Sequence, residues 1–193
     1  MRQTRRVATA VILVNGLPGA GKTTVATALA GELAAVLLSK DAIKEALATV
    51  LPDSVVDRDL GVVAIEAAWN LAGRLPGVVV VESWWFRPRD LRFVDAELRA
   101  VGAARAVEVW CDVPAAVARG RYAMRVRSAL HDDARRLAED WDEWAARAEP
   151  LALTPVVKVD TSRPVDLDSL AHAVRRELAA GGGPVQAGAR ADC

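Results

Sequence analysis

Short apolar runs rich in β-branched residues alternate along the chain with longer segments whose apolar residues recur at helical spacing. The clearest run is Val78–Val81, four consecutive valines, which is typical of a strand buried on both faces of a sheet. The other runs predict strands over Val7–Asn15, Val36–Ser39, Ala106–Cys111 and Val156–Val159. Helical spacing predicts helices over Lys22–Ala34, Asp41–Val50, Asp57–Gly73, Pro88–Val101, Pro114–Arg125, Asp132–Ala148 and Val165–Ala179. This alternation predicts an α/β fold with a parallel sheet covered by helices on both faces.

Length and composition indicate one domain over residues 1–180 and a disordered tail over Gly181–Cys193, which is rich in glycine and alanine. The 193 residues are 52% apolar, which excludes a globally disordered chain. The 25 basic residues balance 25 acidic ones, and this neutrality argues against a general nucleic-acid binder. Two cysteines make no disulfide framework, and no apolar segment reaches the roughly 18 residues that a membrane span needs. We therefore expect a cytoplasmic protein.

The segment GLPGAGKTT fits the pattern G-x-x-x-x-G-K-[ST], and it lies between a predicted strand and a predicted helix. Glycines let consecutive backbone N–H groups turn toward one phosphate, and the helix N-terminus faces the same anion. Lys22 can bridge the β- and γ-phosphates, the Thr23 hydroxyl can ligate Mg²⁺, and Thr24 can bond an α-phosphate. This P-loop predicts a site for ATP and Mg²⁺ formed by Gly16, Pro18, Gly19, Ala20, Gly21, Lys22, Thr23 and Thr24.

An acidic residue, Glu82, directly follows the four valines. In α/β sheets the carboxyl ends of the strands line the ligand crevice, and Mg²⁺ accepts carboxylate ligands, often through water. Glu82 is therefore a candidate for contact with the metal or with a second substrate. The alternative is an ordinary surface carboxylate at a strand end.

With these features the sequence resembles the small P-loop kinases of the adenylate-kinase-like branch. The nearest group contains chloramphenicol phosphotransferase, the kinase domains of polynucleotide kinases, gluconate kinase and zeta-toxin kinases. The resemblance covers most of residues 7–180, and the P-loop is its specific part. It implies a five-stranded parallel sheet of order 2-3-1-4-5, formed by Val36–Ser39, Val78–Glu82, Val7–Asn15, Ala106–Cys111 and Val156–Val159.

In the same group an aspartate just after the second strand deprotonates the acceptor hydroxyl, and the matching residue here is Asp41. The transition state of phosphoryl transfer is loose, so a carboxylate need only orient the hydroxyl and take its proton late. The alternative is that Asp41 caps a helix beginning at Ala42. Lys40 and Lys44 flank Asp41, and each either meets an anionic acceptor or is solvated.

The resemblance also implies a small arginine-rich lid, here over roughly residues 119–138. Planar guanidinium groups can stabilise charge on the moving phosphoryl group. Arg125 and Arg121 are the candidate catalytic arginines, and Arg127 is a candidate contact to the substrate. Many relatives carry R-x-x-R followed by H-P-G-H, whereas RYAMRVRSALHDD lacks the Pro-Gly, so no catalytic role is assigned to His131.

Aromatic residues follow the third predicted strand, where the resemblance implies the acceptor site. Ser83, Trp84 and Trp85 are candidate acceptor contacts, and the indole rings can stack on a sugar, a nucleobase or an aromatic acceptor; core packing is the alternative. Arg87 and Arg89 can hold an anionic group. On the adenine side the resemblance implies contacts after the last strand and at the lid, by Thr161, Arg163 and Arg119.

Together these residues predict an ATP- and Mg²⁺-dependent kinase that phosphorylates a hydroxyl group of a small molecule, such as an antibiotic, nucleoside, sugar or secondary metabolite. A polynucleotide 5′-hydroxyl kinase is an alternative, because a local basic groove would not show in the net charge. A zeta-toxin-like kinase of a sugar nucleotide would carry the same core residues. A regulatory nucleotide-binding switch without an acceptor is the remaining alternative.

Overall fold

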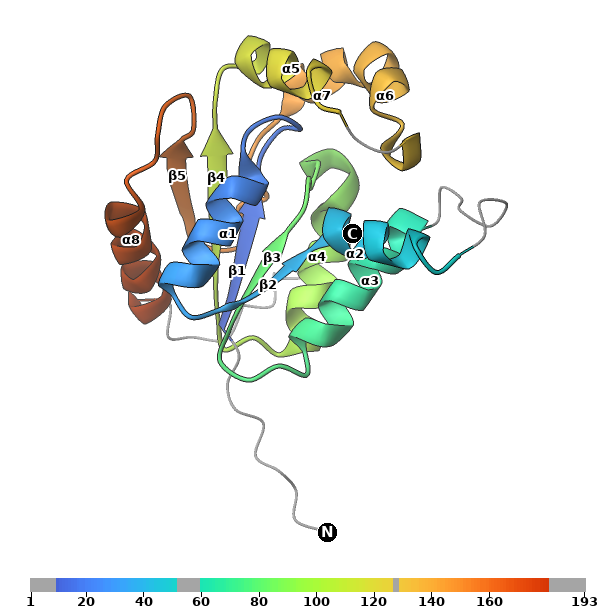
Figure 1. The fold of residues 1–193 in the computed structure, drawn as a ribbon. Helices are drawn as coiled ribbons and strands as arrows, with labels where there is room; N and C mark the ends of the chain where they lie inside the picture. Colours follow the sequence, from blue (N-terminus) through green and yellow to red (C-terminus); the bar gives the residue numbers. More distant parts are fainter. Residues whose placement is uncertain (1–9, 52–59, 127–128, 181–193) are drawn as a thin grey trace, which may run out of the picture.

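The computed structural model describes residues 10–51, 60–126 and 129–180 (Figure 1). Five parallel strands form one sheet of order β2-β3-β1-β4-β5, which confirms the predicted order 2-3-1-4-5. The strands are β1 (Ala10–Asn15), β2 (Val36–Ser39), β3 (Val78–Glu82), β4 (Arg105–Asp112) and β5 (Val156–Asp160). Since all five run in one direction, their carboxyl ends meet at one edge of the sheet.

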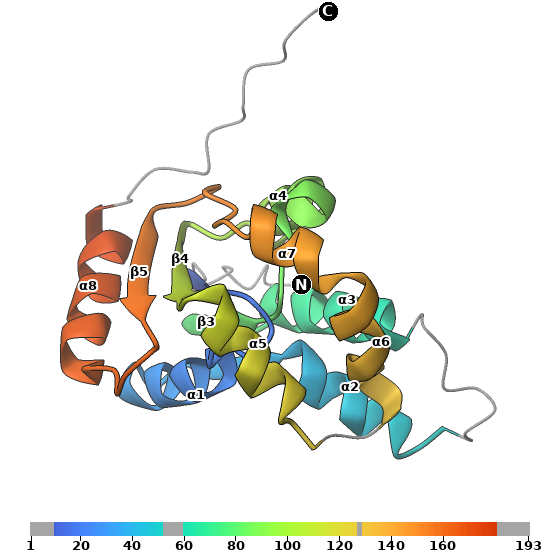
Figure 2. The same ribbon diagram turned by 90° about the horizontal axis from the view of Figure 1, so that it is seen from above.

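Helices cover both faces of the sheet, and a separate group lies above its carboxyl edge (Figures 1 and 2). The helices are α1 (Lys22–Glu32), α2 (Lys40–Ala48), α3 (Leu60–Ala72), α4 (Arg87–Val101), α5 (Ala115–Ala123), α6 (Asp133–Glu139), α7 (Trp141–Arg147) and α8 (Leu167–Ala180). A 3₁₀ turn, η2 (Ala129–His131), precedes α6. Among the described residues, no helix combines the length and the apolar character that crossing a membrane would need.

Alternate side chains of the central strands fill two separate cores. Ile12 and Val80 face α1 and α8, where Leu29 and Val174 are buried. Val79 and its neighbours on β1 face α3 and α4 in the second core. The run of valines therefore packs on both faces of the sheet, as its continuous hydrophobicity predicts.

Two predicted helices differ from those observed. The segment Asp132–Ala148 is two short helices, because Asp140 ends α6 and begins α7 with φ −103°. The turn allows Trp141 and Trp144 to be buried against the lid and the sheet. The helix α2 begins at Lys40 after an extended Ser39, so Asp41 lies inside its first turn and is not its cap.

Some sequence predictions fall outside the described residues. These are the beginning of the first strand before Ala10, the beginning of the predicted helix before Leu60, the lid residue Arg127, and the tail after Ala180. The predictions for these segments stay predictions.

A buried polar cluster ties β1 to β4 and to the segment after β3. Asn15 and Glu108 are fully buried, and Asn15 Nδ2 donates to Glu108 Oε1 at 3.0 Å. The same carboxylate accepts from the backbone N–H groups of Leu151 at 3.0 Å and Ala152 at 2.9 Å. Three donors thus compensate the burial of this carboxylate, as a buried charge requires.

Removing the Glu108 carboxylate should therefore destabilise the fold. We expect Glu108→Ala to lower the free energy of unfolding by about 3–5 kcal/mol, because three donors, two of them buried, lose their acceptor. Glu108→Gln should cost about 1–2 kcal/mol, since one acceptor oxygen remains. Urea denaturation measures both values, with Glu66→Ala on the exposed face of α3 as the control. Equal stability of Glu108→Ala and the control would contradict the assignment.

Candidate functional site

The loop between β1 and α1 takes a backbone path that glycine permits. Gly19 has φ 85°, and a Cβ atom there would lie 2.1 Å from the carbonyl oxygen of Ala118 in α5. At Gly16 a Cβ atom would lie 2.7 Å from the carbonyl oxygen of Cys111 at the end of β4. Both distances are shorter than any real contact, so glycine is required where the loop passes β4 and α5.

The beginning of α1 is open to an anion. Gly21 precedes the helix without a side-chain hydrogen bond to its N–H groups, and the first turn holds no acidic residue. Unpaired N–H groups and the helix dipole therefore face the loop. This end of the helix, together with the lysine beside it, fits the phosphates of a nucleotide.

Lys22 lies in the same loop and is only 7% exposed. Its Nζ donates to the carbonyl oxygen of Leu17 at 3.0 Å. Burial lowers the pKa of the Lys22 ammonium, while the carboxylates of Glu82 and Asp41 oppose that shift. The nearby Arg125 guanidinium lowers this pKa further. A buried cation beside a second cation is a favourable partner for a polyanion such as a triphosphate.

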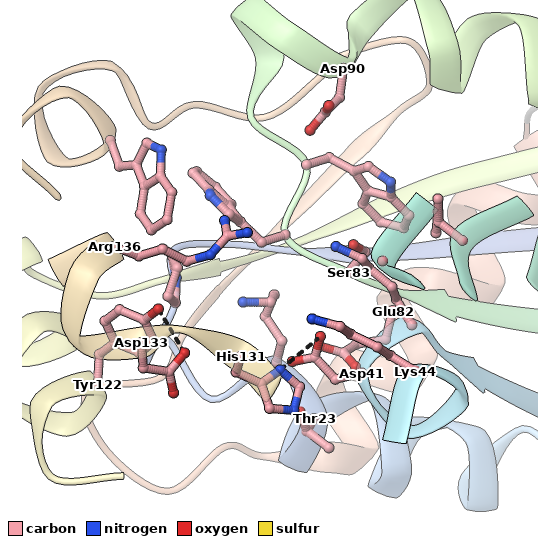
Figure 3. Close-up of a pocket in the computed structure, with 18 of the residues that line it drawn as sticks. Thr23, Asp41, Lys44, Glu82, Ser83, Asp90, Tyr122, His131, Asp133 and Arg136 are labelled. Carbon is pink, nitrogen blue, oxygen red and sulfur yellow. Dashed lines mark hydrogen bonds and ion pairs between the residues drawn. The ribbon is translucent and has the colours of Figure 1, made fainter. Parts of the chain in front are cut away.

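A cavity of about 400 Å³ opens beside the P-loop at the carboxyl edge of the sheet (Figure 3). Its walls come from the P-loop, α2, α3, the segment after β3, α4 and the lid. The predicted site residues that line it are Pro18, Lys22, Thr23, Lys40, Asp41, Lys44, Glu82, Ser83, Trp84, Trp85 and Arg125. The fold therefore brings the P-loop lysine, the candidate base and the candidate acceptor contacts to one cavity.

Asp41 faces the cavity from the first turn of α2, and the lid contacts it there. His131 Nδ1 lies 4.0 Å from Asp41 Oδ1 (Figure 3). His131 Nε2 lies 2.8 Å from Glu45 Oε1, one turn further along the helix. Lys44 Nζ donates to the carbonyl oxygen of Leu130 at 2.7 Å. The side chain of His131 is buried, whereas that of Asp41 is 43% exposed. The turn η2 is thus attached to α2 beside the candidate base.

Glu82 and Thr23 both line the cavity, but they differ in burial. Glu82 is buried and accepts a 2.6 Å hydrogen bond from the Ser39 hydroxyl at the end of β2. Thr23 is exposed at the beginning of α1. The described residues contain no cluster of three or more His, Cys, Asp or Glu side chains that could hold a metal ion by themselves. A hydroxyl and one carboxylate fit Mg²⁺, which keeps several waters and takes further ligands from phosphates.

An aromatic wall closes the side of the cavity away from the P-loop. Trp84 and Trp85 line it together with Phe93 of α4 and Trp144 of α7. Trp84 and Trp144 meet edge to face, with their ring centroids 6.1 Å apart. Within the described chain, the buried Nε1 atoms of Trp84 and Trp85 have no hydrogen-bond partner. The wall therefore offers ring faces and two indole donors.

Further charged residues after β3 and in the lid line the same region. Arg89 forms two hydrogen bonds of 2.7 Å to Asp90, which also caps the beginning of α4 by accepting from the backbone N–H of Phe86. Tyr122 donates to Asp133 Oδ1 at 2.9 Å, and Arg136 extends from α6 toward the middle of the cavity (Figure 3). The positions of Arg136, Asp133 and His131 depend on how the lid folds back over α2, and no local motif indicates this.

Five predicted contacts outside the P-loop do not line this cavity, namely Arg87, Arg119, Arg121, Thr161 and Arg163. Arg121 donates to the carbonyl oxygen of Thr161 at 3.0 Å, behind the P-loop. Arg87, the first residue of α4, donates to Glu149 and to the carbonyl oxygen of Leu151. Arg119 is exposed on α5, and Arg163 is paired with Asp160 at 3.0 Å on the surface. Of these residues, Arg121 and Thr161 adjoin the beginning of α1, because Gly21 lies against Thr161.

A parallel sheet of this order, with a P-loop after its first strand and an arginine-rich lid over its carboxyl edge, defines a P-loop NTPase of the kinase-like class. The profile of the AAA domain family matches residues 11–151, which is most of the chain, and the chain belongs to this family. No curated protein matches the sequence.

Solved structures of kinase-like proteins have the same fold. A Chloroflexus aurantiacus protein provisionally assigned as a kinase superposes with a TM-score of 0.70 and 28% identity, covering 92% of this chain and 99% of that protein. A sugar kinase from Janibacter sp. HTCC2649 gives a TM-score of 0.52 at 21% identity, over 89% and 95% of the two chains. The shikimate kinase of Acinetobacter baumannii gives 0.51 at 16%, over 91% and 95%.

We expect His131→Ala to release η2 from α2. Losing the contact with Glu45 should speed hydrogen exchange at residues 129–131 about fivefold, which corresponds to about 1 kcal/mol. Mass spectrometry of exchange in the free protein measures this rate. His172→Ala, on the exposed face of α8, is the matched control and should leave the rate unchanged. Unchanged exchange in His131→Ala would contradict a role in attaching the lid.

Proposed function

We propose that the chain is an ATP-dependent phosphotransferase that transfers the γ-phosphoryl group to a hydroxyl of a small molecule. The observation that carries the proposal is that Asp41 and Lys22 face one cavity, from α2 and from the P-loop. A base and a phosphate-binding lysine in one cavity place the two substrates of a phosphoryl transfer next to each other.

The donor side is formed by the loop before α1. The N–H groups at the beginning of α1 would bind phosphate oxygens, and Lys22 would exchange its bond to the carbonyl oxygen of Leu17 for the β- and γ-phosphates. Thr23 and, through water, Glu82 would hold Mg²⁺. Bound ATP supplies a γ-phosphoryl group whose bond to ADP breaks while its phosphorus bonds to the acceptor oxygen.

On the acceptor side, Asp41 orients the hydroxyl group and takes its proton late in the transfer. Its partly exposed carboxylate lies at the cavity wall, where a hydroxyl can approach it. Arg125 lines the same cavity as Lys22, and in this proposal its guanidinium stabilises charge on the phosphoryl group in transit. The cavity volume of about 400 Å³ suits a small acceptor.

The P-loop lysine gives a first test of this proposal. We expect Lys22→Ala to lower kcat/KM for ATP about 10²–10³-fold, because the buried ammonium that meets the phosphates is lost. Lys158→Ala, on the exposed side of β5, removes the same charge away from the cavity and should behave as the wild type. Isothermal titration with ATP and steady-state kinetics measure the two effects. Unchanged nucleotide affinity and turnover in Lys22→Ala would contradict the donor site.

The base assignment is tested separately with Asp41→Asn. This isosteric change should leave ATP affinity unchanged and lower phosphoryl transfer about 10²–10⁴-fold, because the amide cannot take the hydroxyl proton. Asp95→Asn on the outer face of α4 is the control. Radiolabelled ATP and a panel of alcohols, sugars, nucleosides and antibiotics identify the acceptor by the mass gain of one phosphate. Full turnover by Asp41→Asn would refute its role as the base.

A further inference from the structure

Two cations at the acceptor side of the cavity have no carboxylate partner. Within the described residues, neither the Lys40 ammonium nor the Arg136 guanidinium has a carboxylate within ion-pair distance, although both line the cavity. Arg136 extends into the cavity from α6 (Figure 3). On the same helix, Arg135 instead points to Asp132 and Glu139 at the surface.

These cations belong to one group that lies apart from the P-loop. Burial lowers the pKa of the Lys40 ammonium, Asp41 opposes that shift, and Arg89, Arg136 and Lys44 add to it. Arg136 therefore lies near Lys40. Arg125 acts on the pKa of Lys22 instead, and both arginines line the same cavity.

The carboxylates around this group already have donors. Asp90 is bound in a bidentate manner by Arg89 and also accepts from the backbone N–H of Phe86. Asp133 accepts from the Tyr122 hydroxyl. Among the residues that line the cavity, six are basic (Lys22, Lys40, Lys44, Arg89, Arg125 and Arg136) and four are acidic (Asp41, Glu82, Asp90 and Asp133). Positive charge is therefore in excess, which favours an anionic ligand.

The aromatic wall offers further unused donors at this place. The Nε1 atoms of Trp84 and Trp85 are buried without an acceptor in the described chain, and Trp85 is 2% exposed. Leaving a buried donor unpaired costs about 1–3 kcal/mol. Both residues line the cavity.

We propose that the acceptor carries an oxyanion group, a carboxylate or a phosphate, which is held by Lys40 and Arg136 while the body of the molecule packs on Trp84 and Trp85. This inference rests on the proposed function, because it names the class of the acceptor: a small hydroxy acid or the phosphate ester of a polyol. Arg136 is well suited to this role, since its planar guanidinium binds two oxygens at once.

The test measures binding without turnover. The melting temperature is recorded with benzoate, phenyl phosphate and the neutral benzamide, each with and without saturating Mg-ADP. We expect both anions to stabilise the protein at concentrations at which benzamide has no effect. Arg136→Gln should weaken anion binding about tenfold, Arg136→Lys should restore part of it, and Arg135→Gln on the same helix should match the wild type.

The relative strength of benzoate and phenyl phosphate, measured with ADP on the P-loop, shows whether the oxyanion is a carboxylate or a phosphate. Equal binding of benzoate and benzamide, no binding of any probe, or anion binding unchanged in Arg136→Gln would overturn the proposal. The shift produced by Mg-ADP alone reports on the donor site. Its absence, together with retained binding of benzoate, would contradict the proposed function and leave the oxyanion site standing.

Discussion

The side chain of Asn15 connects the two sides of the cavity. Its Oδ1 accepts from the backbone N–H of Gly16 at 2.7 Å and from that of Trp85 at 3.1 Å, while its Nδ2 donates to Trp85 O and to Glu108. Gly16 of the P-loop and Trp85 of the aromatic wall are therefore hydrogen-bonded to one buried amide at the end of β1. Glu108 fixes the orientation of that amide, so the separation between the phosphate side and the acceptor side depends on this contact.

The neutral composition of the chain conceals a concentration of positive charge in the cavity. Basic and acidic residues are equal in number, yet three of the four lysines, Lys22, Lys40 and Lys44, line one cavity. Burial raises the free energy of each cation there, and low exposure to water strengthens its attraction for an anion. The same desolvation that lowers the pKa of Lys22 and Lys40 thus favours ligands that bring negative charge.

Backbone features were predictable from the sequence, whereas the directions of long side chains were not. The bounds of β3 and the P-loop follow from the valine run and from glycine spacing, because both are local. Arg121 and Arg136 show the limit, since both come from the arginine-rich segment but only Arg136 reaches the cavity. Their directions depend on the turn at Asp140 and on the contact of η2 with α2, which are tertiary features. No sequence motif indicated the roles of Asn15 and Glu108.

The contact between η2 and α2 has a consequence for the hydrolysis of ATP in the absence of an acceptor. In the proposed function, the lid contacts α2, the helix that carries the base. Arg125 precedes η2 in the chain and Arg136 follows it. Opening of this segment would withdraw the arginine near the phosphates and the arginine near the acceptor together. A nucleotide bound in such an opened site would face water without the complete set of cations, and its hydrolysis would be slow.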